Sequence, residues 1–164
     1  MMDILSEVAV TINVNGRPIK ATVSPEESLL DFLRYRAGVT DVKCGCNKGD
    51  CGTCTVILED KAVKSCLVLA AQVDGKRVLT LQGFEEDALM QALQKSFATH
   101  GAVQCGFCTP GMLLTARNFL EHNPKPERTE IKEAISGNLC RCTGYKKIVD
   151  AVAAVVDNET GEGA

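Results

Sequence analysis

The chain has 164 residues, of which 45% are hydrophobic and 24% charged, a composition typical of a globular protein with a hydrophobic core. Its formal net charge is -3 and its 18 basic residues are scattered, which argues against a nucleic-acid partner. No apolar run reaches the ~20 residues of a membrane span, and the first residues are acidic where a signal peptide would be basic, so we expect a cytoplasmic protein.

The first residues predict a hairpin followed by a helix. Val8–Val14 alternates β-branched residues, and Asn15-Gly16 separates it from a second alternating run, Arg17–Val23, so we expect a two-residue turn between two strands. Ser24-Pro25-Glu26-Glu27 has the pattern of a capping box with proline at the first helical position. The apolar residues after it predict a helix that ends near Gly38.

Two further strands are predicted in the first half. Residues 54–58 and 78–81 are rich in β-branched and aliphatic residues, and Asp60-Lys61 and Asp74-Gly75 are typical of turns. A small sheet with one helix across it is an α+β arrangement, which we expect for the first 80 or so residues.

The second half has a helical period. Apolar residues recur at helical spacing in four stretches, residues 89–97, 112–120, 131–135 and 148–156. We place the change of period between residues 82 and 86, and expect one domain over residues 1–83 and a helical domain over residues 84–157. The polar, glycine-containing residues 158–164 are predicted to be a disordered tail.

Nine cysteines beside two histidines are the unusual part of the composition. Their odd number and the expected reducing compartment favour metal or redox chemistry over a disulfide framework. Four residues separate Cys46 from Cys51, two separate Cys51 from Cys54, and Cys66 follows after eleven more. This spacing is typical of a plant-type 2Fe-2S site, in which three thiolates come from one loop and the fourth from a later segment.

A second quartet lies in the helical half. Cys105 and Cys108 are separated by two residues, and Cys140-x-Cys142 follows after 31 more. Thr109-Pro110 predicts a helix start directly after Cys108, and Thr143-Gly144 predicts another after Cys142. We therefore expect both pairs at helix N-termini, where the positive end of the helix dipole favours an anionic cluster.

Zinc is the alternative occupant of each quartet, because four cysteines also bind structural zinc, although zinc ribbons usually repeat two like Cys-x2-Cys pairs. Cys44 is predicted to be a spare thiol, since starting the first spacing there would leave six residues where four are wanted. His100 and His122 lie outside both cysteine spacings and are not expected to be ligands. No glycine motif for phosphate or dinucleotide binding and no nucleophile triad was found.

Three motifs surround the cysteines: GCNKGDCGTCTV at residues 45–56, QCGFCTPG at 104–111 and GNLCRCTGY at 137–145. In this order they resemble the iron–sulfur small subunit of the xanthine dehydrogenase, or molybdenum hydroxylase, family, and the resemblance covers residues 8–156. It implies an N-terminal plant-ferredoxin-like β-grasp domain and an all-α four-helix-bundle domain, each holding one 2Fe-2S cluster.

The resemblance also implies ligands and partners. The ligands of the first cluster would be Cys46, Cys51, Cys54 and Cys66, and those of the second would be Cys105, Cys108, Cys140 and Cys142. Gln104 and Cys142 would contact a molybdopterin cofactor that a large molybdenum-cofactor subunit binds. A medium subunit would carry FAD, and the assembly would be a heterotrimer or a dimer of heterotrimers.

The implied function is that of an electron-transfer subunit of a molybdenum-containing dehydrogenase or hydroxylase. Electrons would pass from the molybdopterin centre through the second cluster and then the first to FAD, and this chain would have no catalytic site of its own. Two other functions stay open from the residues alone. They are a free-standing two-cluster ferredoxin and a zinc-stabilised interaction module.

Overall fold

The computed structural model describes the backbone of residues 7–160 and the side chains of residues 7–157. The strands are β1 (Val8–Val14), β2 (Arg17–Val23), β3 (Thr55–Leu58), β4 (Lys61–Lys64) and β5 (Arg77–Leu79). They form one five-stranded sheet in the order β2-β1-β5-β3-β4, in which only the β1–β5 pair is parallel. The predicted strands at residues 54–58 and 78–81 correspond to β3 and β5.

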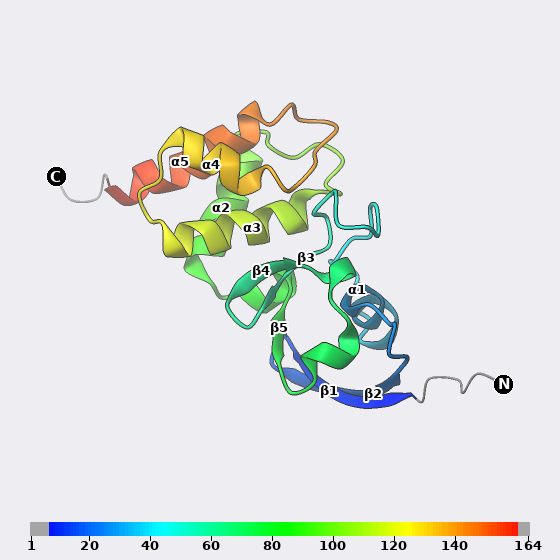
Figure 1. The fold of residues 1–164 in the computed structure, drawn as a ribbon. Coiled ribbons are helices and arrows are strands. Elements are labelled where there is room, and N and C mark those ends of the chain that lie inside the picture. The colour runs from blue at the N-terminus through cyan, green and yellow to red at the C-terminus, as the bar shows by residue number, and fades with distance from the viewer. Residues whose placement is uncertain (1–6, 161–164) are drawn as a thin grey trace.

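Helical segments cover the sheet and fill the second half. They are α1 (Leu29–Asp31), η1 (Phe32–Arg36), η2 (Ser65–Leu67), η3 (Ala70–Val73), η4 (Leu81–Phe84), α2 (Ala88–Thr99), α3 (Thr109–His122), α4 (Arg128–Ile135) and α5 (Lys146–Thr160). Figure 1 shows the sheet with α1 at one end of the molecule and α2 to α5 at the other. The chain is therefore α+β, as predicted. No helix in the described range is long and apolar enough to cross a membrane.

The N-terminal hairpin is confirmed residue by residue. Val14 pairs with Arg17, and the two turn residues between them, Asn15 and Gly16, have φ of 51° and 81°. Left-handed backbone at both turn positions matches the twist of the strands, and asparagine and glycine adopt it at the lowest cost. Alternate residues of β1, including Ile12, are buried against the helical segments α1 and η1.

The first helix starts four residues later than predicted. Its N-cap is Ser28, not Ser24, because the Asp31 N–H donates to the Ser28 hydroxyl at 3.1 Å. The Ser24 carbonyl instead accepts the N–H of Glu27 at 2.9 Å, which makes residues 24–27 a turn. The start predicted at Ser24 is therefore wrong.

Pairing with a distant segment explains the shift. The N–H of Leu29 donates to the carbonyl of Val68 at 2.7 Å, and the N–H of Ala70 donates to the carbonyl of Glu27 at 2.8 Å. Ser28 forms an antiparallel bridge with Leu69 between these two bonds. Because these bonds flank Ser28 and hold it in an extended conformation, the helix begins only at Leu29.

The strand β4 is not predicted by the sequence pattern. Lys61 is its first residue and pairs with Leu58, so the turn lies at Glu59 and Asp60, one residue before the predicted Asp60-Lys61. Glu59 has a φ of 56°, in the left-handed region. The strand has lysine at both ends and only two apolar residues between them, so it lacks the alternation of apolar and polar residues that predicts a strand. Lysine is common on exposed sheet edges.

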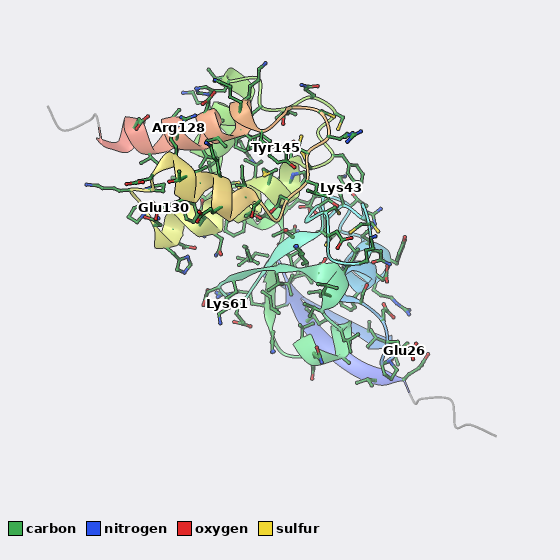
Figure 2. The ribbon with its side chains drawn as sticks, turned by 45° about the horizontal axis from the view of Figure 1, so that its top comes forward. Glu26, Lys43, Lys61, Arg128, Glu130 and Tyr145 are labelled. Atoms are coloured by element: carbon green, nitrogen blue, oxygen red, sulfur yellow. The ribbon has the colours of Figure 1, made fainter. Side chains whose placement is uncertain are left out.

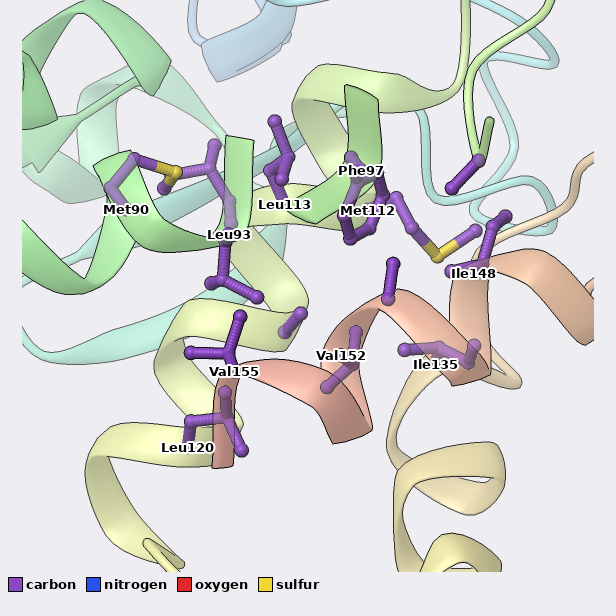
Figure 3. Close-up of a cluster of buried hydrophobic side chains, with 14 of the residues drawn as sticks. Met90, Leu93, Phe97, Met112, Leu113, Leu120, Ile135, Ile148, Val152 and Val155 are labelled. Atoms are coloured by element: carbon purple, nitrogen blue, oxygen red, sulfur yellow. The ribbon is translucent and has the colours of Figure 1, made fainter. Parts of the chain in front are cut away.

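The four helical stretches predicted in the second half each lie in one of the helices α2 to α5. Figure 3 shows how their apolar side chains meet, with Phe97 of α2 beside Met112 of α3 and with Val152 of α5 in the same cluster. Ile57 of β3 belongs to this cluster too, so the sheet and the helices share a boundary of packed side chains. The division at residue 83 falls in η4 and stays a prediction.

The predicted tail is partly helical. The helix α5 continues to Thr160, so the first three residues of the predicted tail, 158–160, are helical. The remaining residues of the predicted tail, 161–164, lie outside the described residues.

A capping carboxylate joins α2 to α3. Asp87 accepts the N–H of Met90 at 2.7 Å and so caps α2. Its other oxygen lies 2.8 Å from Nη2 of Arg117, whose guanidinium carbon is 4.6 Å from the centre of the Phe84 ring. Burial opposes ionisation of Asp87, but the bonds from Arg117 and Met90 outweigh it and lower the pKa of this carboxyl group.

We expect Asp87→Ala to lower the free energy of unfolding at neutral pH by about 1–2 kcal/mol, chiefly through the lost helix cap. Because the folded pKa of Asp87 is lowered, this contribution is full above the ordinary value of 3.8 and is lost as the pH falls through the lowered value. Urea unfolding of both proteins at neutral and acidic pH measures it. Glu121→Ala, which removes an exposed partner of Arg117, is the control and should cost less than about 1 kcal/mol.

Candidate metal centres

Three loops and the short helix η2, which carries Cys66, bring the cysteines to one side of the molecule. One loop leads from η1 to β3, the second joins α2 to α3, and the third joins α4 to α5. Figure 1 shows all three loops at the right of the view, above and beside α1. All nine cysteines are free thiols. The sequence segments that carry the two predicted quartets therefore lie side by side.

The structure brings the first quartet together. Sγ of Cys54 lies 3.4 Å from Sγ of Cys66, which stands in η2. Sγ of Cys46 accepts the N–H of Cys51 at 3.4 Å. Burial raises the pKa of Cys66 to about 12, with further contributions from Cys54 and Cys46, so these sulfur atoms are close enough to interact.

The loop of the first quartet stabilises negative charge on sulfur. The backbone N–H of Lys48, followed by that of Cys51, lowers the pKa of Cys46 to about 6. Gly49 and Gly52 have φ of 89° and 67°, in the left-handed region that glycine adopts at the lowest cost. A Cβ on Gly45 would lie 2.9 Å from Sγ of Cys51. The loop is thus built around the sulfur atoms, with amide groups directed at them.

The second quartet is also brought together. Sγ of Cys105 lies 3.6 Å from Sγ of Cys142. Burial, followed by a hydrogen bond with Cys140, raises the pKa of Cys108 to about 12. Sγ of Cys140 accepts the hydroxyl of Thr143 at 3.0 Å and its N–H at 3.5 Å, and these bonds lower the pKa of Cys140 although burial opposes the shift.

Only one pair of this quartet lies at a helix N-terminus. Cys108 is the N-cap residue of α3, with Pro110 in the first turn, as predicted. The helix α5 begins at Lys146, so the second pair lies on the preceding loop and its predicted place is wrong. Tyr145 accounts for the difference, because its φ of 66° is not helical and α5 starts only after it, while its hydroxyl accepts the N–H of Cys140 at 2.9 Å. Figure 2 labels Tyr145 where the helical part meets the loops.

In both quartets the sulfur atoms form pairs. Among residues 7–157, no three side chains of the metal-binding types converge on a position for a single ion. Two thiolates on one tetrahedral metal ion, with bonds of about 2.3 Å, lie roughly 3.8 Å apart. The Cys54–Cys66 and Cys105–Cys142 pairs, at 3.4 and 3.6 Å, are each close to that separation. Cys46 also interacts with Cys51, and Cys108 with Cys140, so each quartet has two sulfur pairs and suits a cluster of two metal ions.

Gln104 and Cys44 lie next to the quartets along the chain, whereas the two histidines lie at the C-terminal ends of α2 and α3. Gln104 is exposed beside Cys105, and Cys44 is exposed at the entrance of the first loop. The ring Nδ1 of His100 lies 2.9 Å from the Ser96 carbonyl, one helical turn earlier. Nδ1 of His122 lies 2.8 Å from the carbonyl of Asn118, also one turn earlier. Both histidines therefore contact their own helices.

The two residues that precede Cys140, Asn138 and Leu139, connect the quartets and are not among the predicted site residues. The N–H of Leu139 donates to the carbonyl of Cys51 at 2.8 Å. Nδ2 of the buried Asn138 donates to the carbonyl of Gly52 at 2.9 Å. Their position inside a cysteine motif was the available signal, but no local pattern indicates a hydrogen bond to a loop 86 residues earlier.

Comparison with known proteins identifies the domains. Residues 12–80 match the family model of the 2Fe-2S iron–sulfur cluster binding domain, and residues 80–153 match that of the 2Fe-2S binding domain. The chain is 47% identical over 153 residues to the nicotinate dehydrogenase small FeS subunit of Eubacterium barkeri, covering 93% of this chain and 98% of that one.

A second relative and a solved structure agree with this similarity. The xanthine dehydrogenase iron–sulfur-binding subunit of Escherichia coli O157:H7 is 42% identical over 147 residues, covering 88% of this chain and 92% of that one. In the crystal structure of quinoline 2-oxidoreductase from Pseudomonas putida 86, a chain 45% identical to this one superposes with a TM-score of 0.85. The match covers 95% of this chain and 98% of that chain.

Proposed function

The chain belongs to the iron–sulfur small subunits of the xanthine dehydrogenase family, and we propose that it relays electrons between a molybdopterin centre and FAD on partner subunits. It is an oxidoreductase subunit with two 2Fe-2S domains. A bound 2Fe-2S cluster accepts and releases one electron. The observation that carries the proposal is the pair of cysteine quartets, each arranged around close sulfur pairs.

We assign the ligands of each iron from the sulfur pairs. In the first quartet Cys46 and Cys51 would bind one iron, and Cys54 and Cys66 the other, because the contacts run within these pairs. In the second quartet the corresponding pairs are Cys105 with Cys142 and Cys108 with Cys140.

The finer architecture is part of the proposal. We infer a plant-ferredoxin-like β-grasp domain over residues 1–83 and a four-helix-bundle domain over residues 84–157. The mixed sheet with α1 and η1 packed against its buried residues supports the first, and the shared core of α2 to α5 supports the second.

Exposed side chains around the second quartet support a partner there. Val103, Phe107 and Leu139 are 40%, 46% and 51% exposed, and all three lie on the loops that carry the cysteines. Apolar side chains clustered at exposed positions are typical of a protein interface. We propose that a large molybdenum-cofactor subunit covers them and that Gln104 and Cys142 contact its molybdopterin.

The rest of the assembly follows the family. A medium FAD subunit would dock near the first quartet, and the complex would be a cytoplasmic heterotrimer or a dimer of heterotrimers. A free-standing two-cluster ferredoxin is less favoured, because the relatives are named as subunits and the second quartet is surrounded by exposed apolar residues. A zinc module is less favoured, because both family models describe 2Fe-2S domains.

The proposal predicts the metal content of the chain. Protein prepared without air should contain about four iron and four acid-labile sulfide atoms per chain, and the reduced clusters should give two distinguishable EPR signals. Two signals are expected because the quartets differ in the groups that surround sulfur. Elemental analysis and low-temperature EPR measure these properties. Zinc in place of iron, or a single EPR signal, would contradict the proposal.

A further inference from the structure

The backbone segments that carry the two quartets touch at one buried place. The carbonyl of Gly52, between two cysteines of the first quartet, accepts three donors: the N–H of Thr55 at 3.1 Å, the hydroxyl of Thr55 at 2.7 Å and Nδ2 of Asn138 at 2.9 Å. The first two donors belong to Thr55, three residues later at the start of β3. Asn138 is the donor that joins this carbonyl to the helical part of the molecule.

The orientation of the Asn138 amide is set from its other end. The hydroxyl of Thr115, in α3, donates to Oδ1 of Asn138 at 3.0 Å, which directs the amide NH₂ group toward Gly52. The side chain is only 4% exposed, so water does not compete for these bonds. Asn138 therefore links α3, the loop before α5 and the first cysteine loop.

Close backbone packing surrounds this link. A Cβ on Gly52 would lie 2.4 Å from the carbonyl oxygen of Gly137, and a Cβ on Gly111 would lie 2.5 Å from that of Gly52. Only residues without side chains allow three backbones to approach this closely. The distance between the two cysteine loops is thus determined by backbone contact and by the Asn138 amide.

One hydrogen bond then joins the ligand residues themselves. The carbonyl of Cys51 accepts the N–H of Leu139 at 2.8 Å, and Leu139 is bonded to Cys140. The connection from Sγ of Cys51 to Sγ of Cys140 is covalent except for this bond. Along the chain, by contrast, the first quartet ends at Cys66 and the second begins at Cys105.

We propose that Asn138 is a positioning residue for electron transfer between the two clusters. It would promote this transfer by holding the Cys51 carbonyl against the Leu139 amide. This inference rests on the proposed function. In the step that this connection serves, the cluster of the second quartet is oxidised by one electron and that of the first is reduced by one. No bond breaks and no proton moves.

The test compares three variants in the assembled complex. Asn138→Ala removes the link, and Thr115→Val removes only the hydroxyl that orients it, in a side chain of similar shape. Asn118→Ala is the matched control, because Nδ2 of Asn118 also joins α3 to a sheet-side carbonyl, that of Asp60 at 3.0 Å, but away from the cysteines. Pulse radiolysis with methyl viologen radical as the one-electron donor measures the intramolecular phase. Hydrogen exchange of the peptide that contains Leu139 measures the connecting bond.

In Asn138→Ala we expect the intramolecular phase to slow on the order of tenfold, since small displacements have large effects on such steps. Exchange of the Leu139 amide should become faster, while iron stays at about four per chain. Thr115→Val should change both quantities in the same direction by a smaller factor, and it decides the test if Asn138→Ala fails to fold. Asn118→Ala should match the wild type.

Two results separate this inference from the proposed function. In the first, the wild type shows both clusters and an intramolecular phase, but Asn138→Ala has the same rate and the same amide exchange as the control. Asn138 then has no positioning role. If Asn138→Ala does not fold, the same result in Thr115→Val leads to the same conclusion. In the second, the wild type itself does not contain two clusters, and this result contradicts the proposed function and not only the role of Asn138.

Discussion

Cys46→Ser is expected to abolish the cluster of the first quartet and to leave that of the second. Sγ of Cys46 accepts the Cys51 N–H at 3.4 Å, and backbone N–H groups lower the pKa of this thiol to about 6, which favours its thiolate form. A serine hydroxyl stays protonated and is a poor ligand for iron. Iron should fall from about four to about two per chain, with one EPR signal left.

Cys44→Ser is the matched control. Cys44 lies two positions before Cys46 on the same loop and is exposed, so its replacement should leave the iron content and both EPR signals unchanged. Iron analysis and EPR of the two variants, prepared side by side, decide the register of the loop. Loss of a cluster in Cys44→Ser and not in Cys46→Ser would show that the ligand assignment is wrong by two residues.

Phe97→Ala is expected to lower the free energy of unfolding by about 3–5 kcal/mol, because it leaves a cavity where a large side chain is packed. Phe97 is 1% exposed and lies beside Met112 in the cluster that joins α2, α3 and α5 (Figure 3). Denaturant unfolding of the full chain with both clusters bound measures the loss.

Phe107→Ala is the control for this measurement. Phe107 is 46% exposed on the loop between α2 and α3, so its replacement should change the free energy of unfolding by less than about 1 kcal/mol. A loss in Phe97→Ala as small as that in Phe107→Ala would mean that the helical core is not packed as described.

Local patterns predicted much of the backbone. Asn15-Gly16 between two alternating runs specifies its hairpin, because both residues accept the left-handed backbone that the turn requires. The helical stretches of the second half were predicted because each buries one apolar face with a regular period. The cysteine spacings likewise predicted two quartets, and the sulfur contacts run within them. The hairpin and helix signals are each contained in a few neighbouring residues, whereas the cysteine spacings extend over residues 46–66 and 105–142.

Other features depend on contacts between distant segments. The first helix begins at Leu29 because residues 27–29 pair with residues 68–70, although the pattern at Ser24 is locally as good a start. The pairing of Cys105 with Cys142 and the bond from Asn138 to Gly52 are of the same kind. Hydrogen bonds and sulfur contacts between segments form only after the chain has folded, so the order of residues near each partner carries no sign of them.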